Sequence, residues 1–204
     1  MDRHYWDEYY SKNSEPFLNS PFSEFIISEL SKKKSILDIG CGNGRDSIFF
    51  AENKLHTVGI DQSEKAISNL KKYENKFLEF KNTLITDLPY RDFNYGYCRF
   101  LLHSINKQSE RYLIKYLKNN IKESIFIETR ILDKKDKFDF SKMNHYRRIE
   151  SDDYYLSLFK NSDFKVFYKE VSYDFSKYNN EYNVKDIQHD PLVLRLILKK
   201  KSNL

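Results

Sequence analysis

The stretch ILDIGCGNGRDSIFFA, residues 36–51, predicts the fold of this 204-residue chain more clearly than any other. A short apolar run leads into glycines at positions 40, 42 and 44, and a segment with helical apolar spacing follows. Three of the chain's five glycines lie in this loop. Glycine allows sharp turns and leaves space for a ligand against the main chain. We therefore expect a strand, a cofactor-binding glycine loop and a helix, in that order.

A second strand that ends in an acid follows at residues 56–61, HTVGID. Its last residue, Asp61, lies 21 positions after Gly40, about where a carboxylate in such folds binds the ribose hydroxyls of a nucleoside. A dinucleotide fingerprint would have its third glycine at position 45, which is Arg45, and no Gly-Lys-Ser/Thr of a phosphate loop follows. The alternative to a cofactor-binding loop is a tight strand–helix turn that binds no ligand. The position of Asp61 favours the cofactor-binding loop.

The rest of the chain alternates strand-like and helix-like segments. Further strands are predicted at residues 76–82, 95–103, 124–129, 164–171 and 192–198. A helix with Leu113, Leu117 and Ile121 at helical spacing leads into the fifth strand, and Ser151 before two aspartates is a good helix start. We predict an α/β fold with a mostly parallel sheet covered on both faces, as a single domain over residues 1–204 in which residues 1–34 precede the first strand.

Composition sets limits on location and partners. The net charge of +5 combines 35 basic and 30 acidic residues that are interspersed, so it is little reason to expect a nucleic-acid partner. Cys41 and Cys98 are too few for a disulfide framework and lack metal-binding spacing. The sequence shows no apolar run near the roughly 18 residues of a membrane span and no signal peptide. We expect a cytoplasmic protein without a metal or a membrane partner.

These residues resemble the class I S-adenosylmethionine (SAM) methyltransferases. ILDIGCGNG, residues 36–44, is similar to the first motif of that family, and VGIDQS, residues 58–63, to its second. The resemblance implies a Rossmann-like sheet of seven strands with the last strand antiparallel. It also implies SAM as cofactor and S-adenosylhomocysteine (SAH) as product.

The resemblance also implies roles for individual residues. The glycine loop would pass beside the methionine part of SAM, Asp38 would hold the loop and the amino group, Asp61 would bind the ribose, and Gln62 would lie near the adenine. The adenine contact stays open among Asn82, Leu84 and Asp87. The candidate cofactor-binding residues are Asp38, Gly40, Cys41, Gly42, Arg45, Asp46, Asp61, Gln62 and Arg99. Cys41 fits between two glycines as a small side chain, and Asp46 suits a helix start in any case.

A narrower resemblance concerns the substrate. Several short motifs look like a subgroup of bacterial methyltransferases associated with capsule and other surface-polysaccharide synthesis. These motifs are HYWDEYYSKN (residues 4–13) with SPFSEF (20–25), GNGRDS (42–47), RFLLHSI (99–105), IETR (127–130), HYRR (145–148) and DPLVLRLILKK (190–200). The subgroup implies O-methylation of a sugar or a phosphoramidate. The charged stretch at residues 131–144 lacks the glycines expected there, which predicts a shortened or differently shaped lid over the substrate.

The candidate substrate-binding residues are Tyr5, Tyr9, Arg130, His145, Arg147 and Arg148. Guanidinium groups bind phosphate or carboxylate well, so we expect at least one arginine to hold an anionic part of the acceptor. The alternative is that the arginines pair with surface acids such as Asp133, Glu150 or Asp152. The aromatic start of the chain would close over the cofactor, with Trp6 and Tyr10 as cover, or simply pack as an amphipathic helix.

Two histidines, His103 and His145, are the candidate catalytic bases, because imidazole titrates near neutrality. A sugar hydroxyl benefits from a base, whereas a phosphoryl oxygen is already ionised and needs none. A single histidine is more often structural than catalytic, which is the alternative for both.

Three functions remain open: a methyltransferase for a small anionic or glycosyl acceptor, an RNA or protein methyltransferase, and a non-catalytic SAM-binding subunit that assists a second methyltransferase-like chain. The sequence has no appended RNA-binding module and no basic stripe with spaced aromatics, which argues against nucleic acid. We therefore expect a small-molecule substrate.

Overall fold

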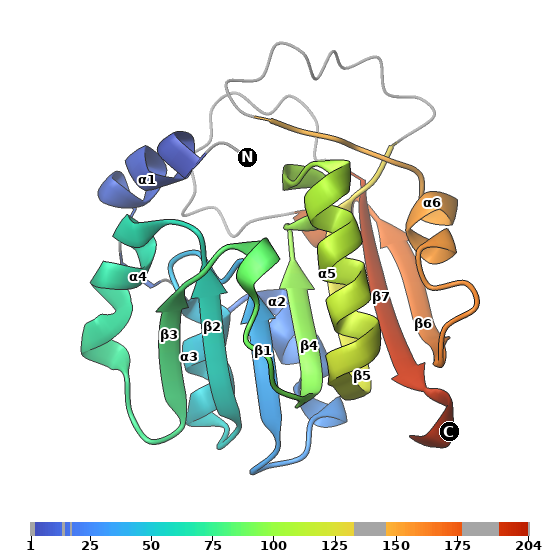
Figure 1. The fold of residues 1–204 in the computed structure, drawn as a ribbon, viewed down its shortest axis with the longest axis horizontal. Helices are drawn as coiled ribbons and strands as arrows, with labels where there is room; N and C mark the ends of the chain where they lie inside the picture. Colours follow the sequence, from blue (N-terminus) through green and yellow to red (C-terminus); the bar gives the residue numbers. More distant parts are fainter. Residues whose placement is uncertain (1–2, 14, 17, 133–145, 177–191, 204) are drawn as a thin grey trace.

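A single seven-stranded sheet organises the protein. The computed structural model describes residues 3–13, 15–16, 18–132, 146–176 and 192–203. Its strands are β1 (Ser35–Ile39), β2 (His56–Asp61), β3 (Leu78–Asn82), β4 (Phe93–Arg99), β5 (Ile121–Arg130), β6 (Phe164–Ser172) and β7 (Val193–Lys200). Their order across the sheet is β3-β2-β1-β4-β5-β7-β6 (Figure 1). The pairings are parallel except those of β7, which runs antiparallel to both β5 and β6. The predicted fold class is confirmed.

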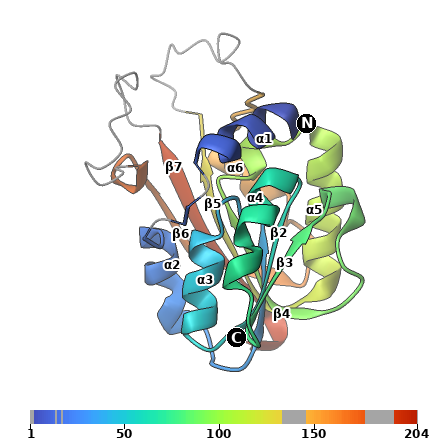
Figure 2. The ribbon, with the colours of Figure 1, turned by 90° about the vertical axis from the view of Figure 1, so that its left-hand side faces the viewer.

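Helices cover both faces of the sheet. Their bounds are α1 (Arg3–Lys12), α2 (Pro21–Ile26), α3 (Arg45–Glu52), α4 (Glu64–Leu70), α5 (Lys107–Asn120) and α6 (Asp152–Ser157). Short 3-10 turns lie at Ile27–Glu29, Lys71–Tyr73, Ile85–Asp87, Leu102–Ser104, Asp174–Ser176 and Lys201–Asn203. Figure 2 shows α2 and α3 on one side of the sheet and α5 on the other. Among the described residues, no helix is long and apolar enough to cross a membrane.

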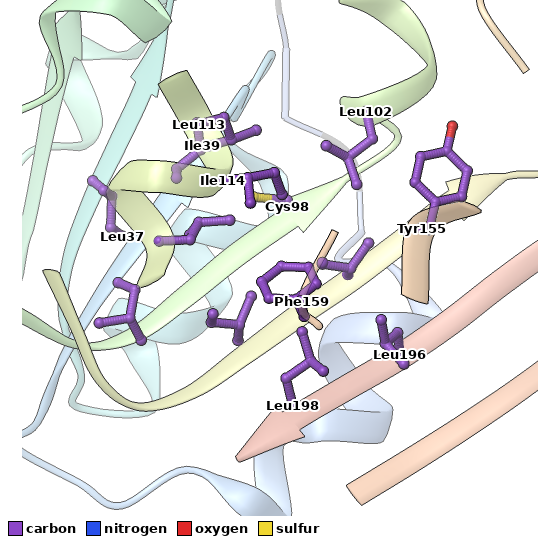
Figure 3. Packing of buried hydrophobic residues seen from close by; sticks show 14 of the residues in the cluster. Leu37, Ile39, Cys98, Leu102, Leu113, Ile114, Tyr155, Phe159, Leu196 and Leu198 are labelled. Atoms are coloured by element: carbon purple, nitrogen blue, oxygen red, sulfur yellow. The ribbon is translucent and has the colours of Figure 1, made fainter. Parts of the chain in front are cut away.

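The central strands are buried on both sides, as expected for a parallel sheet between two helical layers. In β1, Ile36 packs in the cluster under α2 and α3, while its neighbour Leu37 packs in the larger cluster on the opposite face. That larger cluster joins the sheet to α5 and α6, and Figure 3 shows Leu113 and Tyr155 of those two helices among its residues. The strands can therefore place polar side chains only near their ends or in paired networks.

Two predicted boundaries differ from the structure. The strand predicted to continue to residue 103 ends at Arg99, because Phe100 has a left-handed φ of 51° and the 3-10 turn Leu102–Ser104 follows. Ile121, predicted in the helix, is the first residue of β5. The turn after β4 brings His103 to the carboxyl end of the sheet, where this fold binds its ligands.

The first helix, α1, lies above the carboxyl ends of the strands and beside α4 (Figures 1 and 2). Asp7 fixes it there, because its Oδ1 accepts hydrogen bonds from Ser63 Oγ (2.6 Å) and from the backbone nitrogen of Lys65 (3.4 Å). Arg3 adds ion pairs to Asp7 (3.8 Å) and to Glu64 (3.5 Å). The start of α4 thus serves as the docking point of α1.

Candidate functional site

A cavity of about 340 Å³ opens at the carboxyl ends of the central strands. Its walls come from the glycine loop, the ends of β1, β2, β4 and β5, helix α1 and the segment after residue 145. The candidate residues that line it are Tyr5, Tyr9, Asp38, Gly40, Cys41, Gly42, Arg45, Asp46, Asp61, Gln62, Arg99, His103, Arg130 and Arg147. The fold therefore collects residues that are far apart in sequence at one site. Its volume is at the lower end of the range for small-molecule sites.

The glycine loop has the backbone shape that its sequence predicts. Gly40, Gly42 and Gly44 all have positive φ, at 77°, 55° and 75°. A Cβ atom on Gly42 would lie 2.2 Å from the hydroxyl of Tyr10, so a larger residue there requires Tyr10 or the loop to shift. Between the glycines, burial raises the pKa of the Cys41 thiol well above its usual range, which keeps the thiol neutral.

Two carboxyl groups, those of the buried Asp38 and the partly buried Asp61, flank this loop. Asp38 accepts a hydrogen bond of 2.5 Å from Ser47 Oγ, and burial, with the nearby charge of Asp46, raises its pKa to about 8. Asp61 accepts hydrogen bonds from the backbone nitrogens of Gly42 (3.0 Å) and Ser63 (2.9 Å). Burial raises the pKa of Asp61 above its usual value despite these hydrogen bonds. Both acids fit a ligand that carries hydroxyl and cationic groups, as SAM does.

Arg45 and Asp46 begin α3 and also line the cavity. Asp46 accepts hydrogen bonds from the backbone nitrogen of Ser20 (2.7 Å), from Ser20 Oγ (2.9 Å) and from the hydroxyl of Tyr97 (2.8 Å). These contacts tie the start of α2 to the start of α3. Asp46 therefore has a structural task in addition to its place at the cavity.

A network of paired charged side chains extends from the interior of the sheet to the cavity, where Arg99 is its last member. Glu128 of β5 accepts hydrogen bonds from Arg99 Nε (2.9 Å) and from Arg195 Nε (2.7 Å). Sequence reasoning missed Glu128 and Arg195. The signal was present, because each is a charged residue inside an otherwise apolar strand, SIFIETR or LVLRLIL. Such residues are rarely buried unless they are paired.

Helix α1 gives the cavity an aromatic roof. Tyr5, Trp6, Tyr9 and Tyr10 all line it. Burial raises the pKa of Tyr10 well above its usual range, and the charge of Asp61 adds to the effect. The phenol of Tyr10 therefore stays protonated beside the glycine loop, as both a donor and an acceptor of hydrogen bonds.

The opposite end of the cavity is basic. The guanidinium of Arg147 is hydrogen-bonded to Ser104 and lies 5.9 Å from the Trp6 ring. The guanidinium of Arg130 lies 5.8 Å from the Phe100 ring, and its buried Nε has no hydrogen-bond partner among the described residues. A buried donor of this kind is costly unless a ligand or water pairs with it.

Arg148 differs from its neighbour. It does not line the cavity, and its guanidinium pairs with Glu110 and with Glu150 (2.9 Å). Pairing with Glu150 was the alternative for this arginine, so we leave Arg148 out of the candidate acceptor site. The other candidate base, His145, lies outside the described residues, as does Asp133.

The adenine end of the site also differs in detail. Asn82, Leu84 and Asp87 do not line the cavity, whereas the intervening Thr83 and Ile85 do. Asn82 instead donates a hydrogen bond to the backbone oxygen of Asp61 (3.0 Å). In this irregular stretch, strand and helix periodicities could not predict which side chains face the ligand.

Residues 36–124 match a family described as "Methyltransferase domain". The match covers β1 to β4, α5 and the start of β5, and so includes the glycine loop and Asp61. It spans fewer than half of the residues of the chain. No curated protein matches the sequence.

Several solved structures with a similar fold are described as methyltransferases. A SAM-dependent methyltransferase of Methanosarcina mazei has a TM-score of 0.69 at 18% identity, and the alignment covers 90% of this chain and 99% of that one. The Burkholderia thailandensis 1,6-didemethyltoxoflavin-N1-methyltransferase was crystallised with bound 1,6-didemethyltoxoflavin and SAH. It has a TM-score of 0.67 at 14% identity, and the alignment covers 88% of this chain and 76% of that one. The Synechocystis magnesium protoporphyrin IX methyltransferase with bound SAH has a TM-score of 0.67 at 12% identity, and the alignment covers 88% of this chain and 79% of that one.

At these identities the similarity to the solved structures concerns the fold. Residues 36–124 match a methyltransferase domain, and the chain has the fold of solved SAM-dependent methyltransferases. The residues present fit SAM as the cofactor, since the glycine loop, Asp38 and Asp61 face the same cavity. The acceptor is a separate question, because the similar structures have names that point to very different substrates.

Proposed function

We propose that this protein transfers the methyl group of SAM to a small acceptor that carries an anionic group. The main support for this proposal is that one cavity is lined both by the candidate cofactor-binding residues and by two arginines. Asp38, Asp61 and the glycine loop line the cofactor end, while Arg130 and Arg147 line the other. Arginine binds carboxylate and phosphate with two parallel hydrogen bonds, which suits a substrate that must be held in one orientation.

When bound, SAM supplies a methyl group that is activated by its sulfonium. The protein contributes alignment and exclusion of water, the two factors that speed an in-line displacement. On the cofactor side, Asp61 can accept hydrogen bonds from the ribose hydroxyls, and Asp38 can accept a hydrogen bond from the ammonium group. Above them, the aromatic side chains of α1 cover the cavity. The acceptor's lone pair would form the new bond to the methyl carbon while the carbon–sulfur bond breaks and leaves its electron pair on the sulfur of SAH, and a hydroxyl acceptor would also give up its proton.

The class of acceptor follows from the charge at the basic end and from the narrower resemblance in the sequence. The motifs shared with enzymes of surface-polysaccharide synthesis support a glycosyl or phosphoramidate acceptor with oxygen as the methylated atom. Arg147 would hold its anionic group next to Ser104, and Arg130 would supply the Nε donor that has no partner among the described residues.

The test uses purified protein, methyl-labelled SAM and a small-metabolite extract rich in nucleotide-linked sugars. We expect label in an anionic small molecule, and a loss of at least about tenfold in kcat/KM for Arg147→Ala, which corresponds to about 1.4 kcal/mol. Arg111→Ala is the matched control, because Arg111 is an exposed arginine of α5 away from the cavity. Transfer that is equally fast in both variants would contradict the proposed acceptor site.

A further inference from the structure

The side chain of Arg148 is enclosed between three parts of the chain. Its Nη2 donates to Glu110 in the first turn of α5, and its Nη1 donates to Glu150 (2.9 Å). Its Nε lies 3.5 Å from the backbone oxygen of Ile105, directly after the 3-10 turn that follows β4. Only 11% of the side chain is exposed. All three nitrogens of the guanidinium are therefore directed at acceptors of the protein itself.

Glu110 is the buried centre of this network. It is 2% exposed, and besides Arg148 its carboxylate accepts a hydrogen bond of 2.5 Å from the hydroxyl of Tyr154 in α6. Burial and the hydrogen bond to Glu110 raise the pKa of Tyr154, which keeps this donor protonated. A buried carboxylate is costly unless donors and a positive charge compensate it. The pairing of Glu110 with Arg148 therefore holds residues 146–150 against α5 and α6.

The backbone of the same segment is joined to a wall of the cavity. The backbone nitrogen of Arg148 donates to the backbone oxygen of His103 (2.9 Å). On one side of this junction Ser104 and Ile105 line the cavity, and on the other side Arg147 lines it and is hydrogen-bonded to Ser104. We call these three residues the acceptor wall. Arg148 does not line the cavity, so it lies behind this wall and connects it to α5.

We infer that Arg148 is a positioning residue for the acceptor, which acts by holding the acceptor wall in place against the first turn of α5. This inference rests on the proposed function and adds to it a residue that does not touch the acceptor. A guanidinium suits the task better than an ammonium, because its nitrogens form a rigid planar fork that reaches acceptors on several segments at once. Without Arg148, the buried charge of Glu110 would be uncompensated, and the wall would lose its connection to α5.

Transfer kinetics separate positioning from a role in stability alone. The donor is methyl-labelled SAM, and a small-metabolite extract at graded dilutions supplies the acceptor. We expect Arg148→Ala to raise the half-saturating amount of extract about tenfold, while the maximum rate and the Kd of SAM stay within about threefold. Arg111→Ala is the control, because it removes an exposed arginine from the position next to Glu110. A folded Arg148→Ala variant with an unchanged half-saturating amount would overturn the inference.

Arg148→Lys keeps the test valid if the alanine variant fails to fold. Lysine retains a positive charge beside Glu110, but its single nitrogen cannot also reach Glu150 and Ile105. We expect Arg148→Lys to unfold at nearly the same urea concentration as the unmodified protein and still to raise the half-saturating amount at least threefold. Kinetics identical to those of the unmodified protein would show that no bridging guanidinium is needed.

Trp6 reports on the acceptor wall without any methyl transfer. It is the only tryptophan of the chain, it lines the same cavity, and its ring lies 5.9 Å from the guanidinium of Arg147. In the SAH complex we expect Arg148→Ala to shift the fluorescence of Trp6 to longer wavelength, because water enters where the wall separates from α1. Arg111→Ala should leave the emission unchanged.

The two measurements distinguish failure of this inference from failure of the proposed function. If the unmodified protein transfers no label to the extract, the proposed function fails, and the emission of Trp6 still decides whether Arg148 holds the wall. Emission that is the same in Arg148→Ala and in the unmodified protein would overturn the inference, even if the protein methylates an anionic metabolite.

Discussion

Gly42 is a residue of the cofactor loop that lies against Tyr10 of α1. It combines a positive φ of 55° with the hydroxyl of Tyr10 at the position where a Cβ would lie. We expect Gly42→Ala to weaken SAM binding at least tenfold, because the loop or α1 must shift to admit the methyl group. Isothermal titration with SAM measures this effect.

Asn43→Ala is the control for the same loop. Asn43 follows Gly42 directly and also lines the cavity, but its amide donates to the backbone oxygen of Glu15 (3.1 Å). It should leave SAM affinity within about threefold. Equal weakening in the two variants would mean that the loop is sensitive to any substitution and that the space beside Gly42 has no special role.

Asp38 makes the stability of the free protein depend on pH. Its pKa rises from an ordinary value near 4 to about 8 on folding, so the folded protein binds more protons than the unfolded chain between those pH values. Stability therefore falls as pH rises from about 4 to 8. In denaturant titrations, Asp38→Asn should reduce this slope by up to about 1.4 kcal/mol per pH unit. An unchanged slope would show that Asp38 is already ionised in the free protein.

At the scale of elements, α1 is held over the cavity by a contact with the start of α4. Ser63 is the junction, because its hydroxyl donates to Asp7 while its backbone nitrogen donates to Asp61. Loss of the Asp7 side chain removes contacts of the size of a helix cap, about 1 kcal/mol. We expect Asp7→Ala to raise the Kd of SAM about fivefold and to speed amide hydrogen exchange in α1.

Glu8 provides the comparison within the same helix. It is exposed, pairs with Lys12 (2.9 Å) and does not line the cavity. Glu8→Ala should leave SAM affinity unchanged. If both variants bind SAM like the unmodified protein, the docking of α1 has no part in cofactor binding.

The sequence predicts the bounds of helices and strands well where the apolar periodicity is strong. It predicts them poorly where the backbone angle of a single residue determines where an element ends. β2 occupies the predicted residues 56–61, because turn residues bound an apolar run. The end of β4 was wrong by four residues, since a positive φ at Phe100, a bulky residue, leaves no trace in an apolar pattern. The docking of α1 on α4 depends on a contact between Asp7 and Ser63, which no local pattern predicts.

At the scale of the whole molecule, paired charges join three strands of the sheet. Glu128 is 1% exposed and is held between Arg99 and Arg195. The removal of one partner from a buried ionic network leaves uncompensated charge and typically costs about 3–5 kcal/mol. We expect Glu128→Gln to lower the free energy of unfolding by that amount in urea titrations. Glu79→Gln, at an exposed pair with Lys81 (3.0 Å), should change it by less than about 1 kcal/mol.

The packing of the whole molecule determines which candidate arginine lines the cavity, and the sequence could not predict this. Arg147 and Arg148 are adjacent and chemically identical, yet one lines the cavity and the other pairs with Glu110 of α5, 38 positions away. The different contacts of these two arginines depend on how segments that are distant in the sequence pack together. By contrast, the glycine loop and Asp61 could be predicted, because a strand, a turn and a helix in sequence place them at the same edge of a parallel sheet.

The central claim is methyl transfer to a small anionic acceptor, and one measurement tests it most directly. The purified protein is incubated with ordinary SAM or with SAM that carries a deuterated methyl group, in the presence of either small metabolites or RNA and protein from the source cells. Mass spectrometry then finds products whose mass differs between the two incubations by the isotope content of one methyl group. The account predicts such a product among anionic metabolites. Transfer only to RNA or protein, or to a neutral molecule whose methylation does not depend on Arg147, would contradict it.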